Sequence, residues 1–203
     1  MKKTTNEYEH KYWPEAVIGI DEAGRGPLAG PLVVAGVIFP SGYENDDIYD
    51  SKGLSEKRRE QLFEIIKEDA LEYEILIISS EEIDKVNILN ATKNGMFEIG
   101  KALNGNIVLT DAVDIKIDNK IVIPIVKGDQ KSISIAAASI LAKVTRDNIM
   151  KKYHLKYPEY GFDKNKGYPT KKHLEALEKY GVLDIHRKTY GPIVKLNQLK
   201  LDL

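Results

Sequence analysis

The chain has 203 residues, of which 30 are basic and 31 acidic, giving a formal net charge of −1. This length fits one domain of about 100–200 residues, and the absence of cysteine excludes disulfides, thiolate metal sites and cysteine nucleophiles and fits a reducing cytoplasm. The first fifteen residues lack the apolar core of a signal peptide, and no apolar run reaches the ~20 residues that span a bilayer. We therefore expect a cytoplasmic protein with no membrane partner.

The charge is distributed unevenly along the chain. Residues 1–142 hold 16 basic and 24 acidic side chains, whereas residues 143–203 hold 14 basic and 7 acidic ones. An acidic body joined to a basic C-terminal quarter points to nucleic acid or another anion as a partner. Solvated helix faces would produce the same asymmetry, so charge alone leaves both interpretations open.

The first part of the chain is predicted to alternate strands with helices. Two apolar, β-rich runs flank the segment GRGPLAGP, whose glycines and prolines end both strands. Ser55 and Ser79 stand where helix N-caps are expected, and Glu82 completes a capping-box pattern after Ser79. The predicted elements are strands over 16–22 and 33–39, a helix over 56–71, a strand over 73–78 and a short helix after 79.

The middle of the chain contains a periodic apolar run, two strands and a long helix. Residues spaced by three and four predict one buried helix face, formed by Leu89, Thr92, Met96, Ile99 and Leu103. Strands are expected over 107–111 and 121–126, and Pro124 is typical of an edge strand or a bulge. A helix from 132 to about 153 begins with the nearly uncharged SISIAAASILA, which we expect in the core, and continues with basic side chains that should face solvent or an anion.

A Gly- and Lys-rich loop follows Pro158, and then a helix over 170–180 and a basic tail. Because strands come first and helices later, we expect an α/β fold with a helical C-terminal extension.

Carboxylates stand at three predicted strand ends. Asp21 and Glu22 end the first strand, Asp111 ends IVLTD, and Asp129 precedes the most buried helix. Single acids at such places are often helix caps or turn formers, but a cap uses only one carboxylate of an adjacent pair. With no cysteine and no histidines at ligand spacing, a site of this kind would have only oxygen ligands and would suit Mg²⁺ or Mn²⁺ rather than zinc.

The loop after the acidic pair brings glycines and a cation close to those carboxylates. Gly24 and Gly26 let the backbone approach a ligand, and Arg25 carries a fixed charge. A tight turn would explain the glycines equally well. The position of the loop, directly after two acids, favours phosphoryl transfer.

Basic side chains in the C-terminal quarter are candidates for contacts with phosphate. Lys143 and Arg146 share a helix face, which is either a phosphate-binding surface or a solvated one. Lysines surround Tyr168, and this mixture suits a groove that follows a nucleic-acid backbone. The four histidines share no spacing, and we interpret them as structural or surface groups.

Over roughly residues 15–192, the sequence resembles bacterial ribonuclease HII. The resemblance is carried, in family order, by IGIDEAGRGPLAGPLVVAGV, DSKGLSEKRR, LTDAV, KGDQKSISIAAASILAKVTRD, GYPTKKH and HRKTY. It implies a ribonuclease H-like mixed central sheet flanked by helices, with a helical C-terminal extension. It further implies a monomer that uses two divalent ions, Mg²⁺ or Mn²⁺, to cut RNA in RNA–DNA hybrids. The substrates would include a single ribonucleotide embedded in duplex DNA, cut on its 5′ side to leave 3′-hydroxyl and 5′-phosphate ends. The corresponding role is ribonucleotide removal and RNA primer processing.

The resemblance also assigns site residues by position. The catalytic and metal-binding acids would be Asp21, Glu22, Asp111 and Asp129, with Asp147 as the competitor for the fourth place. The substrate-binding residues would be Gly24, Arg25 and Gly26, which read the 2′-hydroxyl and its phosphate, Lys52, which resembles a phosphate contact, Lys143 and Arg146, whose segment favours a positioning role rather than catalysis, and Tyr168, which packs on the sugar at the RNA-to-DNA junction. Pro169 stands where many relatives carry glycine, and we expect it to stiffen the Tyr168 loop.

The last six residues, Gln198–Leu203, resemble the short peptides by which bacterial replication proteins bind the sliding clamp. An edge strand or a tail packed on its own domain is the alternative. We accordingly expect an N-terminal arm over 1–14, a catalytic core over 15–156, a helical substrate-binding region over 157–197 and the tail over 198–203.

Three rival functions are weaker. Ribonuclease HIII carries an extra N-terminal domain, and only about fifteen residues precede the first strand here. For a non-catalytic nucleic-acid-binding module on the same fold, all four acids are present, so nothing in the sequence supports lost activity, and an activity assay decides. A carboxylate-metal phosphatase for small molecules would need neither the Gly-Arg-Gly loop nor the basic C-terminal quarter.

Overall fold

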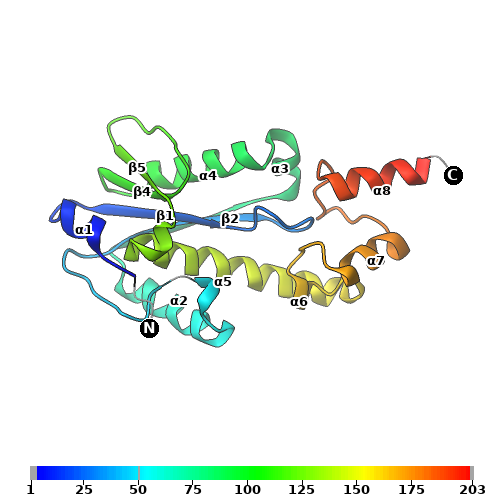
Figure 1. Cartoon of the computed structure of the whole chain (residues 1–203), viewed down its shortest axis with the longest axis horizontal. Coiled ribbons are helices and arrows are strands. Elements are labelled where there is room, and N and C mark those ends of the chain that lie inside the picture. The colour runs from blue at the N-terminus through cyan, green and yellow to red at the C-terminus, as the bar shows by residue number, and fades with distance from the viewer. Residues whose placement is uncertain (1–3, 50, 202–203) are drawn as a thin grey trace.

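The computed structural model describes residues 4–49 and 51–201 as a central sheet with helices on both faces (Figure 1). The helices are α1 (Glu7–Tyr12), α2 (Glu56–Asp69), α3 (Ser80–Val86), α4 (Ile88–Ala102), α5 (Ile133–Lys156), α6 (Phe162–Asn165), α7 (Lys171–Tyr180) and α8 (Gly191–Leu201). The strands are β1 (Val17–Ala23), β2 (Leu32–Ile38), β3 (Glu72–Ile78), β4 (Ile107–Asp111) and β5 (Ile121–Ile125). Short 3₁₀ turns lie at Ser51–Gly53, Gly128–Gln130 and Pro158–Tyr160.

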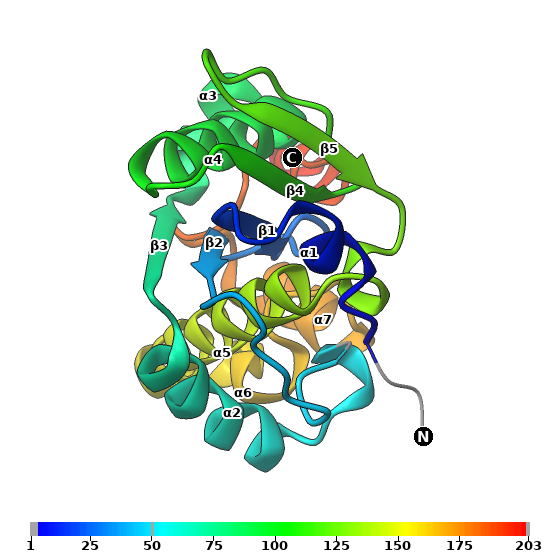
Figure 2. The same cartoon turned by 90° about the vertical axis from the view of Figure 1, so that its left-hand side faces the viewer.

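The five strands form one mixed sheet in the order β3-β2-β1-β4-β5. Helices α3 and α4 cover one face and α5 and α2 the other, while α6, α7 and α8 gather beyond one end of the sheet (Figures 1 and 2). This arrangement confirms the predicted α/β fold with a helical C-terminal extension. In the described part of the chain, no helix is both long and apolar enough to cross a membrane.

The parallel pairing of β1 with β4 determines where two of the predicted acids lie. Ile20 stands opposite Thr110 in this ladder, so the next residue of each strand, Asp21 or Asp111, leaves the sheet at the same end. Residues far apart in sequence are thereby placed at one edge, where the carboxyl ends of parallel strands commonly form a site.

Helix α5 supplies most of one core layer. Its first half is buried as expected, because β1 and β2 pack directly against it. Gly19 makes the close approach possible, since a Cβ there would lie 2.2 Å from the backbone carbon of Ser134. At its start, Ser132 accepts a hydrogen bond from the Ile135 amide, and buried Glu9 of α1 accepts from the Ser132 hydroxyl and the Ser134 amide.

Most predicted elements match the observed ones to within a few residues. The N-caps Ser55 and Ser79 are confirmed by hydrogen bonds from Arg58 and Glu82 amides, and Pro124 lies on the edge strand β5. One expectation is wrong: Leu89 is 48% exposed. It lies in the first turn of α4, at the margin of the face that the residues from Thr92 to Leu103 bury.

Candidate active site

A cavity of about 380 Å³ lies at the end of the sheet where β1 and β4 deliver their acids. It brings together all but one of the residues predicted for the site; the exception is Asp129. The lining consists of Asp21, Glu22, Ala23, Gly24, Arg25, Gly26, Ser51, Lys52, Asp111, Ser139, Lys143, Arg146 and Tyr168.

The carboxylates of Asp21 and Glu22 are held in an environment that disfavours their charge. Burial raises the pKa of Asp21 well above its ordinary value, and the nearby carboxylates of Glu22 and Asp111 raise it further. Burial also raises the pKa of Glu22 to about 7, although the Arg25 guanidinium, 3.6 Å away, opposes that shift. Neighbouring acids with raised pKa values are typical of functional carboxylates.

The hydrogen bonds of these acids leave ligand positions open. Oδ1 of Asp21 accepts from the Glu22 amide at 2.7 Å, and Oδ1 of Asp111 accepts from the Gly128 amide at 2.8 Å. Oε2 of Glu22 is buried and has no hydrogen-bond partner among the described residues. Buried carboxylate oxygens with unused acceptor capacity suit a hard divalent cation. The donor set therefore fits Mg²⁺ or Mn²⁺.

The acids line one wall of the cavity without closing around a single point. Among the described residues, no three Asp, Glu, His or Cys side chains are gathered tightly enough to form a complete metal cluster. After burial, the charge of Asp111 contributes to the raised pKa of both Asp21 and Glu22, and repulsion of this kind opposes a tighter arrangement of the carboxylates.

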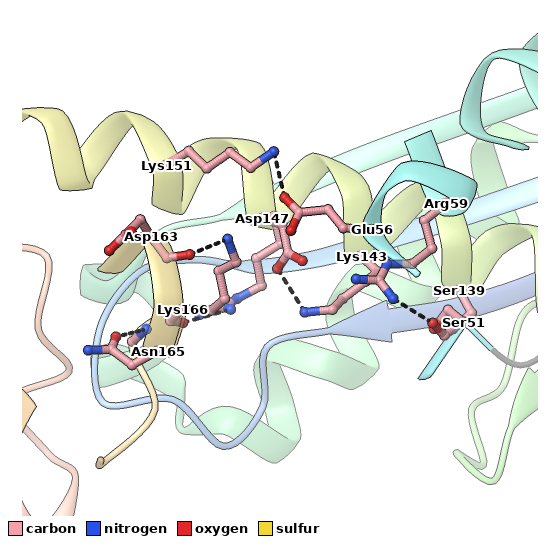
Figure 3. A network of polar contacts seen from close by, with 12 residues as sticks. Ser51, Glu56, Arg59, Ser139, Lys143, Asp147, Lys151, Asp163, Asn165 and Lys166 are labelled. Carbon is pink, nitrogen blue, oxygen red and sulfur yellow. Dashed lines mark hydrogen bonds and ion pairs between the residues drawn. The ribbon is translucent and has the colours of Figure 1, made fainter. Parts of the chain in front are cut away.

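The fourth acid is not settled by the cavity itself. Asp129 is buried in the turn Gly128–Gln130, beside the amide that binds Asp111, but does not line the cavity. Its rival, Asp147, also lies outside the lining, and its Oδ1 pairs with Nζ of Lys143 at 2.7 Å (Figure 3). Asp129 remains a prediction as a site residue.

Two lysines and two serines form the wall beside the acids. Lys52 belongs to the turn Ser51–Gly53, and its charge lowers the pKa of Glu22. The hydroxyls of Ser51 and Ser139 lie 2.9 Å apart, joining that turn to α5. Figure 3 shows Lys143 of α5 near Ser51 and Ser139. Both lysines line the cavity.

Arg146 does not face solvent or an anion, and the expected phosphate contact is wrong for it. Its side chain reaches the cavity wall but is only 1% exposed. The guanidinium donates to the carbonyls of Pro31, Lys166 and Ala29 at 2.9, 3.0 and 3.1 Å. The helix face that carries it packs against loops, and Arg146 fastens the β1–β2 loop to the segment before Tyr168.

A second buried arginine, Arg187, was not predicted as a functional residue. It is fully buried and donates to carbonyls of the β1–β2 loop, including those of Gly24 and Arg25. The only sequence signal was its place in HRKTY, one of the segments that carry the family resemblance. Nothing in the spacing of that segment distinguishes it from a surface cation.

Tyr168 lies beside Gly26 of the Gly-Arg-Gly loop at the cavity. Its side chain is 44% exposed, and a Cβ on Gly26 would lie 3.3 Å from its Cε1. Its carbonyl lies 2.9 Å from Nδ1 of His173, whose Nε2 lies 3.1 Å from Nε2 of His186. These two buried histidines are structural, as expected, and they hold the Tyr168 loop in place.

Comparison with known proteins agrees with this geometry. The family described as Ribonuclease HII matches residues 18–192. Ribonuclease HII of Caldanaerobacter subterraneus subsp. tengcongensis is 53% identical over 190 residues, covering 90% of this chain and 78% of the relative. The crystal structure of ribonuclease H2 from Pyrococcus horikoshii superposes with a TM-score of 0.81 at 27% identity, covering 93% of this chain and all of that one. Ribonuclease HII from Archaeoglobus fulgidus, solved as a complex with PCNA, superposes with a TM-score of 0.77 at 31% identity, covering 92% of this chain and 98% of that one.

Proposed function

Since this chain belongs to the ribonuclease HII family and is thus a metal-dependent ribonuclease H that acts on RNA–DNA substrates, we propose that it also cuts on the 5′ side of a single ribonucleotide in duplex DNA. The observation that carries the proposal is one cavity that combines three carboxylates, the Gly-Arg-Gly loop and Tyr168. The products would be a 3′-hydroxyl and a 5′-phosphate.

Asp21, Glu22 and Asp111 would hold two divalent ions, Mg²⁺ or Mn²⁺, with Asp129 as the fourth acid. When bound, such ions supply an activated water and stabilise charge on the leaving 3′-oxygen. The unpartnered Oε2 of Glu22 and the raised pKa values of Asp21 and Glu22 support this assignment. Cation binding would offset the repulsion between these carboxylates and favour their charged forms.

The remaining lining residues would bind and orient the substrate. Lys52 and Lys143 would neutralise phosphates next to the scissile one, and Tyr168 would pack against the sugar at the junction. The backbone of the Gly-Arg-Gly loop would read the 2′-hydroxyl, the one group that distinguishes RNA from DNA at a given position. Discrimination would thus need no contact with base edges.

Cleavage of a synthetic duplex with one embedded ribonucleotide, in the presence and absence of Mg²⁺ or Mn²⁺, tests the proposal. We expect a metal-dependent cut on the 5′ side of the ribonucleotide, with product ends identified by end-labelling. The control is the same duplex with a deoxynucleotide at that position. Cutting of the all-DNA duplex at a comparable rate would contradict the proposed specificity.

We further propose that the protein acts as a cytoplasmic monomer in ribonucleotide removal and primer processing, with residues 157–197 forming much of its substrate-binding surface.

The C-terminal peptide would bind the replication sliding clamp. The Archaeoglobus fulgidus relative, solved with PCNA, supports a clamp partner. Gln198 is exposed at the end of α8, while residues 202–203 of the peptide lie outside the described residues. Deleting residues 198–203 should abolish clamp binding in a pull-down with purified clamp; unchanged binding, or none in the intact protein, would exclude the idea.

A further inference from the structure

Arg187 is fully buried in the segment between α7 and α8, and its guanidinium is directed at a loop at the other end of the sequence. Every guanidinium nitrogen donates to a backbone carbonyl of the β1–β2 loop. Nη2 binds the Gly24 carbonyl at 2.6 Å, and Nη1 binds that of Arg25 at 2.9 Å. Nε and Nη2 also bind the Gly30 carbonyl, and Nη2 reaches that of Pro31. The Arg187 guanidinium therefore holds this loop in its observed conformation.

Tyr190 completes this hold from the same side. Its hydroxyl donates to the Arg25 carbonyl at 2.7 Å and accepts from Nη1 of Arg187 at 2.9 Å. The Arg187 guanidinium also lies over the Tyr190 ring, 5.1 Å from its centroid. Neither side chain lines the cavity, whereas the loop that they hold does. The two residues thus support the loop from behind.

The planarity of the peptide bond converts this hold into a direction for the amide groups. In a trans peptide, the C=O of one residue and the N–H of the next point in opposite directions. The carbonyls of Gly24 and Arg25 point at Arg187. The amide N–H groups of Arg25 and Gly26 must therefore point away from Arg187, to the side on which these residues line the cavity.

The conformation at Gly24 keeps the first of these peptides from turning over. Its φ is +104°, a value that L side chains rarely adopt, and a Cβ there would lie 2.1 Å from Nε of Arg146. Arg146 also holds the carbonyls of Ala29 and Pro31, further along the same loop. The loop is fixed by two buried cations before any ligand arrives.

We propose that Arg187 is a positioning residue that sets specificity for a ribonucleotide by aiming the amides of Arg25 and Gly26 into the cavity. There the two N–H groups donate to the 2′-hydroxyl oxygen and the adjoining phosphate. This inference rests on the proposed function. A deoxynucleotide has no 2′-oxygen, so it leaves a donor unpaired. A peptide turned the other way would direct a carbonyl at the phosphate and repel it.

The substitution Arg187→Lys tests the proposal, because an ammonium group cannot span these carbonyls as a planar guanidinium does. The probes are two fluorescent duplexes that differ only by one ribonucleotide or deoxynucleotide, and their affinities are measured by anisotropy in EDTA, so that no cleavage occurs. We expect the natural protein to prefer the ribonucleotide duplex by roughly tenfold and Arg187→Lys to reduce this preference to about twofold. Affinity for the all-DNA duplex should stay nearly constant, which a general loss of structure would not allow.

Tyr160→Phe is the matched control, because the Tyr160 hydroxyl also donates to a backbone carbonyl, that of Gly181, in a part-buried hydrogen bond outside the β1–β2 loop. It should keep the full preference. An unchanged preference in folded Arg187→Lys would overturn the inference and leave the proposed function standing. No preference in the natural protein would overturn both. If Arg187→Lys does not fold, Tyr190→Phe decides: a roughly two- to fourfold loss of preference supports the inference, and no loss overturns it.

Discussion

Buried charges have different surroundings on two walls of the cavity. The acid wall is formed by Asp21, Glu22 and Asp111, and the loop wall by the Gly-Arg-Gly loop and Arg146. On the acid wall, Asp21 and Glu22 lie close to a third carboxylate, and burial raises the pKa of both. On the loop wall, burial lowers the pKa of Arg146 to about 10, and behind this wall it also lowers the pKa of Arg187, yet the donors of both guanidiniums are bound by carbonyls. The guanidiniums are bound by carbonyls of their own chain, whereas Oε2 of Glu22 has no hydrogen-bond partner among the described residues. The acid wall therefore has an acceptor available for a ligand, whereas the guanidiniums that support the loop already have hydrogen-bond partners.

The largest effect should follow from a change on the acid wall. Asp21→Asn removes one carboxylate but preserves the side-chain shape, and we expect turnover to fall on the order of 10³-fold or more, since metal-ion catalysis contributes several kcal/mol. Binding of an RNA–DNA hybrid, measured in EDTA, should remain largely intact. The metal-free variant should unfold at a higher urea concentration, because it removes a source of repulsion. A collapse of binding with a proportional loss of activity would mean that Asp21 does not have a metal role.

On the loop wall, a change should affect stability first. Arg146→Met leaves three backbone carbonyls without their donor, and we expect a loss of about 3–5 kcal/mol in the free energy of unfolding. Urea denaturation measures it. The control is Lys152→Gln on the exposed side of α5, which should change stability by no more than about 0.5 kcal/mol. Equal, small changes in both variants would show that Arg146 is no more than a surface cation.

The histidine pair behind Tyr168 adds a pH dependence to the loop wall. Burial, with a contribution from nearby His173, lowers the pKa of His186 to about 4 from an ordinary value of 6.5. The unfolded chain therefore takes up a proton between these values and the folded chain does not, so stability is complete above about pH 6.5 and falls as the pH drops towards 4, by about 3 kcal/mol at most. Urea midpoints between pH 7.5 and 5 measure the slope. His186→Gln, which retains a donor but does not titrate, should flatten it; an unchanged slope would assign the effect to other groups.

The smallest effect concerns a cation that faces the cavity. Lys143→Gln should weaken duplex binding only a few-fold and reduce the slope of log affinity against log salt by about 1, since one phosphate contact is lost. Titrations at several salt concentrations measure this slope. Lys93→Gln on α4, across the sheet, is the control and should leave the slope unchanged. A slope that is the same in both variants would remove Lys143 from the substrate surface.

The acids and the Gly-Arg-Gly loop could be predicted from the sequence, but the buried contacts that hold the loop could not. Asp21, Glu22 and Asp111 follow apolar strands, and parallel strands deliver their ends to one edge, so pattern and topology agree. The role of Arg146 depends on which carbonyls surround it. Every residue has a backbone carbonyl, so the sequence does not indicate which of them will lie near this side chain. The role of Arg187 likewise depends on backbone carbonyls and could not be predicted. Asp129 lies in the turn Gly128–Gln130, which follows Lys127 with φ +59°, and a backbone turn of this kind cannot be placed from periodicity.

The hydrogen bond between Arg187 and the Arg25 carbonyl joins residues 162 positions apart. During synthesis, the loop that would recognise the substrate is made before β4, α5 and α7, whereas its support is made after them. A nascent chain can therefore form its first strands and even present its carboxylates before it can hold the loop in shape. Such long-range closure is slow to form, because distant segments must meet before any contact stabilises them. The β1–β2 loop can therefore be held in this shape only after the segment that contains Arg187 has joined the fold.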